Sequence, residues 1–365
     1  MGEFWQAAVT SLRRLAEQVP DLARRTVALA LTGQCGGTWL IDEDGDPVAP
    51  ARLGCDRRAA PLVTTWCQEG VGEELRRRTG SPIDPSLQSV QLAWIARHEP
   101  ELLAAAATAL HGKDWLYFCC TGERATDPAE AVAAYGDIRR RTSVLDLLHL
   151  EEIAPLLPEI VDGTRHWGAL SAAAAAATGL SPGTPVVLAP PDVIAIGLAA
   201  GIHQPGHKIG CTSLDRTCAH QQILRDPTKI ADQPTPSVLP FADSWIGLIA
   251  NAPGTAHGEW LIGMCEQFLA DAGLIGMPRR DLLDLLERQA AEATPGQLRF
   301  QPMLATDGLA KLSGLSAQTT LYDMMRAIYE SLGFAARTSF EALDGRPDEI
   351  RLTGAAAGSD LCRQV

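Results

Sequence analysis

The sequence predicts an α/β fold arranged in two domains. Apolar runs that end at Gly or Pro alternate with segments in which apolar residues recur at helical spacing. The chain has 365 residues, which is more than a single hydrophobic core usually accommodates. A Gly- and Pro-containing change of pattern at 201–206 is the best boundary, so we expect domains at 1–204 and 205–365.

The first elements follow from local patterns. An amphipathic pattern predicts a helix over 3–18, because its apolar side chains share one face. The run 27–31 is apolar throughout, which is typical of a strand buried on both faces. Two strand-like runs around Asp42-Glu43-Asp44-Gly45-Asp46 predict a hairpin, since Asp-Gly is a strong turn signal. A helical pattern then covers 86–110.

The later elements continue the alternation. We predict, in order, an Ala-rich helix at 171–178, a buried strand at 184–189, a small-residue helix at 193–200, a long helix near 321–332, a last strand at 350–353 and a turn at 354–359. Strands that alternate with helices in this way are characteristic of α/β folds.

Composition and charge exclude several classes of partner. The net charge is −13, which repels nucleic-acid phosphates and anionic lipid, so we expect neither a nucleic acid nor a membrane as partner. No apolar stretch is long enough to span a bilayer. The nine cysteines lack the spacing of a disulfide framework or a zinc site, so we expect reduced thiols, a cytoplasmic location and no protein-bound metal.

Several common catalytic signatures are missing from the sequence. It contains no Walker A loop and no G-x-G-x-x-G. Its one G-x-S-x-G match, at 179–183, lies between a predicted helix and a predicted strand, whereas a nucleophile elbow follows a strand and opens a helix. It also lacks H-E-x-x-H, and its eight histidines are scattered. P-loop, Rossmann, hydrolase and metalloprotease interpretations therefore have no support from motifs.

Asp192 is the most informative single residue. It follows the predicted strand 184–189 and precedes the predicted helix 193–200. One interpretation is a helix cap, in which the carboxylate accepts a backbone N–H. The other is a carboxylate at the carboxyl end of a strand, where open α/β sheets bind ligands and where it could accept a proton from a substrate hydroxyl. The two roles are compatible.

Two further segments are candidates for ligand contact. The turn Thr32-Gly33-Gln34-Cys35-Gly36-Gly37 is rich in Gly, which lets the backbone approach a small ligand closely, although an ordinary tight turn has the same composition. The triplet Asp56-Arg57-Arg58 offers a carboxylate and guanidinium groups that can bind vicinal hydroxyls, and an exposed ion pair within the triplet is the alternative.

Four blocks in sequence order resemble the FGGY carbohydrate kinases. They are Thr32-Gly33-Gln34 with the 39–45 hairpin and Asp56-Arg57-Arg58; Thr121-Gly122-Glu123-Arg124-Ala125-Thr126-Asp127; Thr178-Gly179-Leu180 with the segment 182–201; and Arg326-Ala327-Ile328-Tyr329-Glu330-Ser331 with Arg351-Leu352-Thr353-Gly354. The matches run collinearly from about residue 4 to residue 365, and their order and spacing make the resemblance specific.

The resemblance implies an actin-like, ribonuclease H-like ATPase fold of two domains. It also implies transfer of a phosphoryl group from ATP, assisted by Mg²⁺, to a hydroxyl of a small sugar or polyol. Asp192 matches the position of the family's general base. The sugar-binding positions implied are Gln34, Cys35, Gly36, Asp56 and Arg57, and the nucleotide-binding positions are Gly210, Thr212, Ser213, Gly354, Ala355 and Ser359.

The sequence also departs from the family pattern. No D-x-G-T hairpin precedes Met1 and little follows Gly354, so we expect a chain truncated at both ends. Ala355 and Ala356 stand where the family has Gly, and each adds a Cβ where close approach or positive φ can be required. Pro190-Pro191 replaces a Gly-rich approach to Asp192.

Two functions from different classes follow. Gly37 to Asp42, Tyr135-Gly136-Asp137 and Asp192-Val193 resemble the erythritol and L-xylulose kinase branch, so we rank erythritol first and L-xylulose second as substrate. The alternative is an inactive kinase remnant that acts at most as a sugar-binding or interaction module. A hydrolase or binding protein unrelated to kinases is weaker still, because the one G-x-S-x-G match, at 179–183, does not follow a predicted strand as a nucleophile elbow does. A homodimer is left open.

Overall fold

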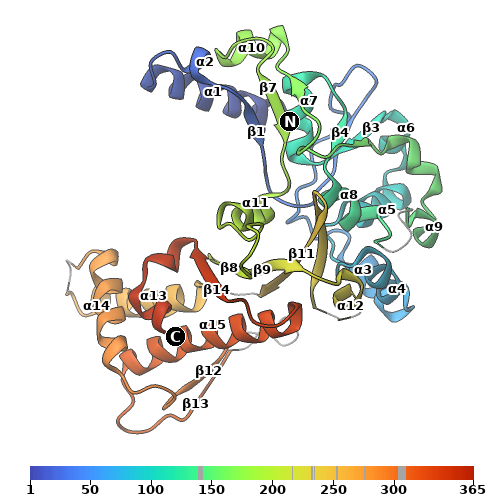
Figure 1. Cartoon of the computed structure of the whole chain (residues 1–365). Helices are drawn as coiled ribbons and strands as arrows, with labels where there is room; N and C mark the ends of the chain where they lie inside the picture. Colours follow the sequence, from blue (N-terminus) through green and yellow to red (C-terminus); the bar gives the residue numbers. More distant parts are fainter. Residues whose placement is uncertain are drawn as a thin grey trace. The chain divides into compact units, whose positions relative to one another are not determined.

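Helices and strands alternate along the chain in the computed structural model, which describes all residues except 139–142, 216, 232, 234, 252–253, 275–276 and 303–309 (Figure 1). The chain divides into two units. Unit 1 contains Met1–Ala195 and Leu224–Gly247, and unit 2 contains Ile196–Ile223 and Leu248–Val365. The chain thus passes between units after Ala195, Ile223 and Gly247, whereas the sequence shows one break near 201–206. The functional division into 1–204 and 205–365 stays a prediction.

Unit 1 contains most of the short elements. Its helices are α1 (Gly2–Gln18), α2 (Leu22–Arg25), α3 (Ala60–Gln68), α4 (Val71–Thr79), α5 (Gln88–His98), α6 (Pro100–Ala105), α7 (Gly112–Thr121), α8 (Pro128–Tyr135), α9 (Leu145–Leu148), the 3₁₀ helix η1 (Glu151–Leu156), α10 (Ala172–Thr178) and α12 (Pro227–Ala231). Its strands are β1 (Leu29–Leu31), β2 (Trp39–Ile41), β3 (Thr108–Leu110), β4 (Ala125–Thr126), β5 (Glu159–Ile160), β6 (Gly168–Ala169), β7 (Pro185–Leu188) and β10 (Ser237–Phe241).

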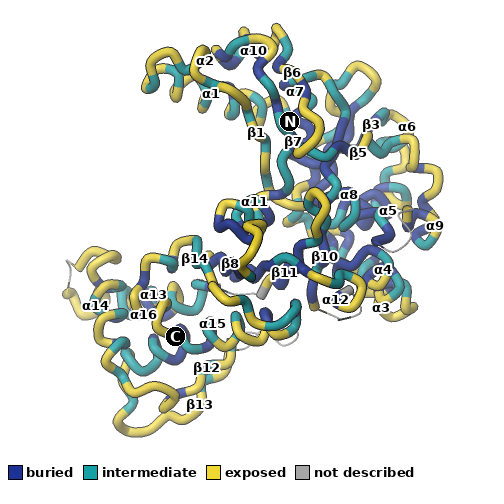
Figure 2. The backbone as a smooth tube through the Cα atoms, viewed as in Figure 1, coloured by how far each residue is buried: buried dark blue, intermediate teal, exposed yellow. Residues whose placement is uncertain are grey.

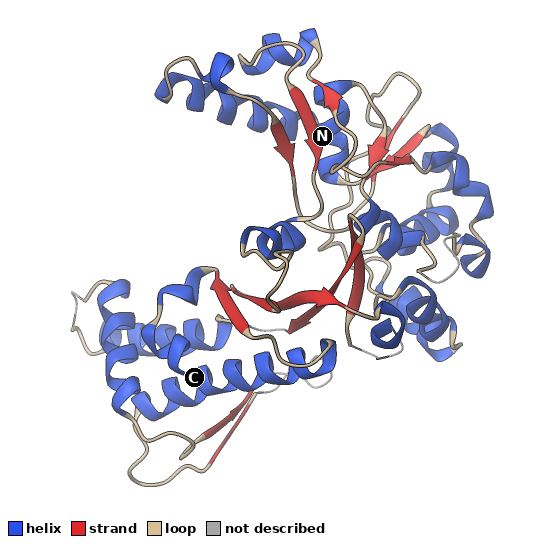
Figure 3. Cartoon of the chain, viewed as in Figure 1, coloured by secondary structure: helices blue, strands red, loops and turns tan. Residues whose placement is uncertain are grey.

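Unit 2 is built on a sheet and a group of longer helices (Figure 3). Its elements are β8 (Ile209–Leu214), β9 (Cys218–Leu224), α13 (Ala256–Asp271), α14 (Arg279–Glu292), β12 (Arg299–Gln301), β13 (Lys311–Ser313), α15 (Leu321–Leu343), β14 (Glu349–Thr353), the 3₁₀ helix η2 (Ala355–Gly358) and α16 (Asp360–Gln364). Helix α11 (Asp192–Ala199) and strand β11 (Ser244–Asn251) begin in unit 1 and end in unit 2, and the last residue of β9, Leu224, belongs to unit 1. β8 pairs in parallel with β14 and antiparallel with β9.

The strand that leads to the Gly-rich turn is less buried than the sequence predicts. β1 pairs in parallel with β7, with Leu29 opposite Val186 and Leu31 opposite Leu188, and β6 pairs on the other side of β7. Leu29 and Leu31 are half-buried and Ala30 is exposed. The prediction of burial on both faces is wrong, because β1 lies at the edge of this described sheet and one side of it has no neighbouring strand.

The helical pattern predicted over 86–110 is also only partly right. It resolves into α5, α6 and the strand β3, which pairs antiparallel with β2. Pro100 at the start of α6 ends the first helix, because Pro has no N–H to donate and its ring excludes a continuing helix. The strand at 108–110 depends on its distant partner β2, which a local pattern does not reveal.

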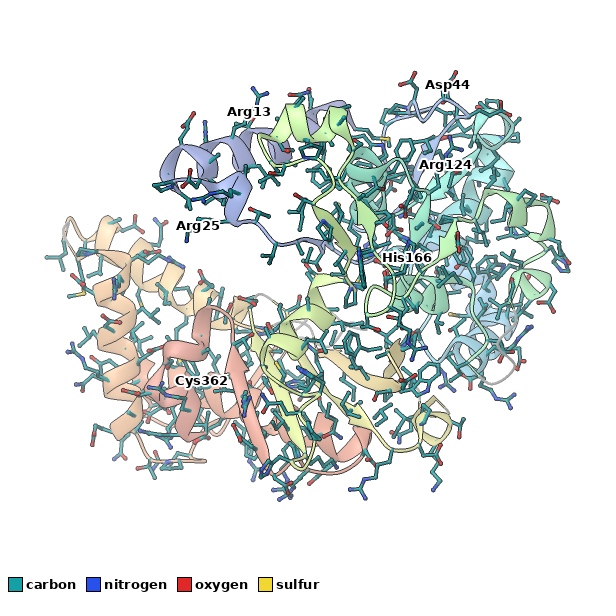
Figure 4. The ribbon with its side chains drawn as sticks, turned by 45° about the horizontal axis from the view of Figure 1, so that its top comes forward. Arg13, Arg25, Asp44, Arg124, His166 and Cys362 are labelled. Atoms are coloured by element: carbon teal, nitrogen blue, oxygen red, sulfur yellow. The ribbon has the colours of Figure 1, made fainter. Side chains whose placement is uncertain are left out.

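The predicted hairpin after β2 is confirmed. The Asp42 N–H donates to the Asp46 carbonyl at 2.9 Å, which closes the turn. Arg124 stabilises the turn from another segment of the chain, because its Nη2 donates to the carbonyls of Asp42 at 3.0 Å and Glu43 at 2.6 Å. Figure 4 shows Arg124 beside the loop that carries Asp44.

Each unit has a hydrophobic core of its own (Figure 2). In unit 1 the largest cluster includes Trp66, Leu92, Ile95 and Leu148, and in unit 2 it includes Leu261, Leu286, Met325, Ile328 and Leu361. Within the described ranges, no helix has the length and apolar character needed to cross a bilayer.

Candidate active site

Asp192 and the Gly-rich turn meet at the carboxyl ends of β1 and β7. The Asp192 N–H donates to the Gly33 carbonyl at 2.9 Å. The Thr32 hydroxyl donates to the Pro190 carbonyl at 2.7 Å, and the Ala189 N–H donates to Leu31 at 2.9 Å. Parallel pairing of the two strands therefore brings the segments 31–33 and 189–192 side by side, at the edge of a sheet where α/β proteins bind ligands.

Asp192 begins α11 and keeps an accessible carboxylate. Its Oδ1 lies 2.7 Å from the N–H of the next residue, Val193, whereas a capping side chain accepts from an N–H two or three residues further along. The residue is exposed, so its carboxylate remains accessible to a ligand. The local contact and the accessibility coexist.

The turn between β1 and β2 requires Gly at two positions. Gly36 has φ +71° and Gly37 has φ +91°, in the left-handed region that L side chains rarely adopt. A Cβ on Gly36 would lie 2.5 Å from the Ser86 carbonyl oxygen. This is the tight turn of the alternative interpretation, and it leaves Gln34 and Cys35 exposed beside Asp192 while Gly36 is buried.

Asp56 and Arg57 do not pair with each other. Asp56 accepts from Nε of Arg58 at 3.0 Å, and this hydrogen bond lowers the pKa of the Asp56 carboxyl. Arg57 instead lies 3.5 Å from Oδ2 of Asp84. Both are exposed or half-exposed ion pairs. The segment that carries them lies near the Gly-rich turn, because a Cβ on Gly54 would be 3.0 Å from the carbonyl oxygen of Cys35.

A buried ionic cluster beneath the turn was missed by sequence reasoning. Lys113 Nζ lies 2.8 Å from Asp114 Oδ1 and 2.5 Å from Asp127 Oδ2. His111 Nδ1 lies 2.9 Å from Asp114 Oδ2, and its Nε2 lies 3.6 Å from Glu130 Oε2. All five side chains are buried. We call these residues the ionic cluster.

The ionic cluster contacts the Gly-rich turn directly. The Gly36 N–H donates to both carboxylate oxygens of Glu130 at 3.3 Å. Lys113 packs under the start of the turn, since a Cβ on Gly33 would lie 3.4 Å from the Lys113 Cβ. The available signal was the pair Lys113-Asp114 inside α7, an otherwise apolar helix where an unpaired charge would be costly.

The pKa shifts in the ionic cluster follow from burial and neighbouring charge. Burial opposes the ionisation of Asp114, but Lys113 and His111 hold the pKa of its carboxyl well below its usual value. Burial also opposes the protonation of His111, but Glu130 and Asp114 raise its pKa. The pKa of Glu130 is raised by burial, which outweighs the attraction of His111 and Lys113.

Four of the predicted nucleotide-binding residues gather around the turn that follows β14 in unit 2. Gly354 follows β14 and has φ +91°, and Ala355 and Ser359 belong to the same turn. Ser213, at the end of β8, lies opposite Thr353 in the parallel pair. A cavity of about 320 Å³ adjoins this turn, and its lining includes Thr255, Ile262, Ile328, Tyr329, Ala355, Ala356 and Ser359.

Gly210 and Thr212 are not brought to that cavity. A Cβ on Gly210 would lie 2.7 Å from the Phe340 ring. Thr212 Oγ1 lies 3.1 Å from Nδ1 of His220, and Thr212 lines a different cavity of about 710 Å³. Successive residues of a strand point to opposite faces of the sheet, which is why the neighbours Thr212 and Ser213 differ.

Comparison with known proteins supports the interpretation of these motifs. A model of the FGGY family of carbohydrate kinases, N-terminal domain, matches residues 1–198. Over its whole length the chain is 34% identical to an erythritol kinase of Brucella abortus and covers 73% of that protein. It is 27% identical to an L-xylulose/3-keto-L-gulonate kinase of Escherichia coli, again covering 100% of this chain and 73% of the relative.

Solved structures show the same fold at lower identity. The xylulose kinase from Rhodospirillum rubrum matches with a TM-score of 0.85 and 24% identity, over 99% of this chain and 74% of that chain. The gluconate kinase from Lactobacillus acidophilus matches with a TM-score of 0.82 and 19% identity, over 99% and 74%. The predicted fold class is confirmed. The chain belongs to the FGGY family of carbohydrate kinases and has their actin-like ATPase fold.

Proposed function

We propose that this carbohydrate kinase transfers the γ-phosphoryl group of ATP to a hydroxyl of a small polyol, with erythritol as the first candidate and L-xylulose as the second. The support is the similarity along the whole chain to relatives named erythritol kinase and L-xylulose/3-keto-L-gulonate kinase. The identity is higher to the relative named erythritol kinase, 34% against 27%, so we rank erythritol before L-xylulose.

The hydrogen bond between the Asp192 N–H and the Gly33 carbonyl is the observation that carries the proposal. It holds an exposed carboxylate next to the turn with Gln34 and Cys35, so a polyol bound on the turn has a proton acceptor beside it. The substrate oxygen attacks the γ-phosphorus while the bond to the β–γ bridging oxygen breaks. ADP leaves, and the hydroxyl proton passes to Asp192.

Cys35 would contribute a neutral thiol to the polyol site. Desolvation, and then the carboxylates of Glu130 and Asp192, raise the pKa of this thiol well above its usual value. The residue keeps an exposed surface, so a ligand on the turn can reach the thiol. A neutral thiol beside carboxylates suits an uncharged, hydroxyl-rich substrate better than an anionic sugar.

The cavity at the turn after β14 is our candidate for the adenosine part of ATP. At about 320 Å³ it has the size of a small-molecule site, and its wall combines apolar side chains such as Ile262, Ile328 and Tyr329 with charged ones such as Glu259 and Arg280. Mg²⁺ would arrive with the ATP phosphates, on which it neutralises developing charge. In the part of the chain that the structure describes, no three metal-ligating side chains cluster to hold a separate ion.

A coupled ADP-release assay tests the proposal. The purified chain is given ATP and Mg²⁺ with erythritol, L-xylulose, D-xylulose, glycerol or gluconate. We expect the highest kcat/KM with erythritol. Absence of turnover with every substrate, in protein that is folded by circular dichroism, contradicts the kinase proposal. Calorimetry with erythritol alone then tests the alternative of a sugar-binding module.

A further inference from the structure

We propose that Asp215 is a positioning residue that holds the wall of the nucleotide cavity in place. The inference rests on the proposed use of that cavity for ATP. Asp215 lies in the connection between β8 and β9, immediately after Leu214. It is not among the residues that the sequence pattern singles out, and its side chain does not line the cavity.

Both oxygens of the Asp215 carboxylate are engaged. Oδ1 accepts the Ala355 N–H at 3.1 Å, and Oδ2 accepts the Ser213 hydroxyl at 3.0 Å. Hydrogen bonds to an ionised carboxylate are stronger than those between neutral groups. The side chain therefore ties the end of β8 to the turn that follows β14.

The backbone of Asp215 makes a second connection. Its carbonyl accepts the Thr255 N–H at 2.9 Å, at the start of α13. The chain approaches so closely here that a Cβ on Gly254 would lie 2.1 Å from the same carbonyl oxygen. Thr255 and Ala355 line the cavity from two different segments, so one residue fixes the spacing of two parts of its wall.

The close packing around Asp215 also explains why the turn after β14 requires Gly at position 354. Gly354 has φ +91°, and a Cβ there would lie 2.8 Å from Asp215 Oδ2 and 2.8 Å from the Leu214 carbonyl oxygen. Ala355 and Ala356 lie in the 3₁₀ helix η2, where φ is negative and a Cβ is tolerated. The Ala residues that replace family Gly therefore do not prevent the turn from forming.

Three variants test the role of Asp215. Asp215→Ala removes both acceptors, whereas Asp215→Asn keeps an acceptor oxygen without the charge. Asp271→Ala is the matched control, because Asp271 is an exposed carboxylate of unit 2 that accepts only from Gln267 among the contacts described. Calorimetry with ATP and Mg²⁺ gives affinity, and steady-state kinetics give KM for ATP and for erythritol separately.

We expect Asp215→Ala to weaken ATP binding about 10-fold and to leave KM for erythritol unchanged, since two hydrogen bonds to a charged group are lost. Asp215→Asn should recover most of the affinity, and Asp271→Ala should match wild type. A merely structural role would lower stability without this split between the two KM values. ATP affinity that is equal in wild type and Asp215→Ala overturns the inference.

Hydrogen exchange without nucleotide separates this inference from the proposed function. In wild type the amide of Ala355 should be protected, and Asp215→Ala should lose that protection whether or not ATP binds. Unchanged protection overturns the positioning role. Wild type that shows this protection yet binds no ATP overturns the proposed function instead, and with it the purpose assigned to the turn.

Discussion

Two buried histidines, one in each unit, have different neighbours, and their pKa values shift in opposite directions. His111 in unit 1 lies among carboxylates, 2.9 Å from Asp114 and 3.6 Å from Glu130. His220 in unit 2 lies 3.1 Å from the Thr212 hydroxyl, and its ring makes a T-shaped contact with the Phe340 ring, with 5.8 Å between the ring centroids. Burial disfavours the charged imidazole at both sites.

The neighbours then decide the outcome. The carboxylates around His111 outweigh burial and raise its pKa, whereas nothing opposes burial at His220 and its pKa falls to about 4. The Gly-rich turn of unit 1 is therefore supported by buried charges, whereas the buried His220 in the sheet of unit 2 is neutral. Variants of each region should respond to charge and pH in opposite ways.

The largest expected effect is at the exposed carboxylate of unit 1. Asp192→Asn keeps the shape and the contact with Val193 but removes the proton acceptor, so kcat should fall by about 10²- to 10⁴-fold. The midpoint of urea unfolding should stay close to that of wild type. Turnover near the wild-type value refutes the assignment of Asp192 as the base.

Removing the central cation of the ionic cluster should cost the most stability. Lys113→Met leaves Asp114 and Asp127 buried without their partner, which should lower the free energy of unfolding by about 3–5 kcal/mol. The control is Lys229→Met in the same unit, because the Lys229 side chain is 82% exposed. Equal urea midpoints for the two variants would show that the cluster contributes no net stability.

The pH response of unit 2 follows from His220. Between pH 6.5 and about 4 the unfolded chain binds a proton that the folded protein does not. The free energy of unfolding should therefore decrease by ~3 kcal/mol as the pH is lowered from 6.5 to about 4. His220→Gln should flatten this part of the curve. Urea midpoints at pH 7, 6 and 5 measure it, and parallel curves for variant and wild type contradict the shift.

Unit 1 should show the smaller effect, in the opposite direction. Because the folded pKa of His111 is raised, its contribution is complete below the usual pKa of about 6.5 and is lost as pH rises through the raised value. Lys113, Asp114 and Glu130 are the charged groups that face it. His111→Gln should remove the decline in stability above pH 6.5, and an unchanged decline assigns it to another group.

Sequence patterns located the candidate site better than they described its contacts. Asp192 and the Gly-rich turn were both predicted, because a strand end, a helix start and a cluster of Gly are local signals. The ionic cluster was missed, since nothing local indicates that Glu130 meets the Gly36 N–H. Within the triplet Asp56-Arg57-Arg58 the ion-pair alternative holds for Asp56 and Arg58, and only the structure shows which of the two Arg side chains Asp56 contacts.

By itself the sequence determined the α/β alternation, the position of Asp192 at a helix start soon after a strand, and the family blocks in their order. Only the tertiary structure decided that Asp192 meets Gly33, that Glu130 supports Gly36 and that Asp215 links Ala355 to Thr255. The physical reason is the separation along the chain between the residues that interact. Elements follow from steric and hydrophobic patterns within a few residues, whereas these contacts join segments that become neighbours only when the strands pair and the helices pack.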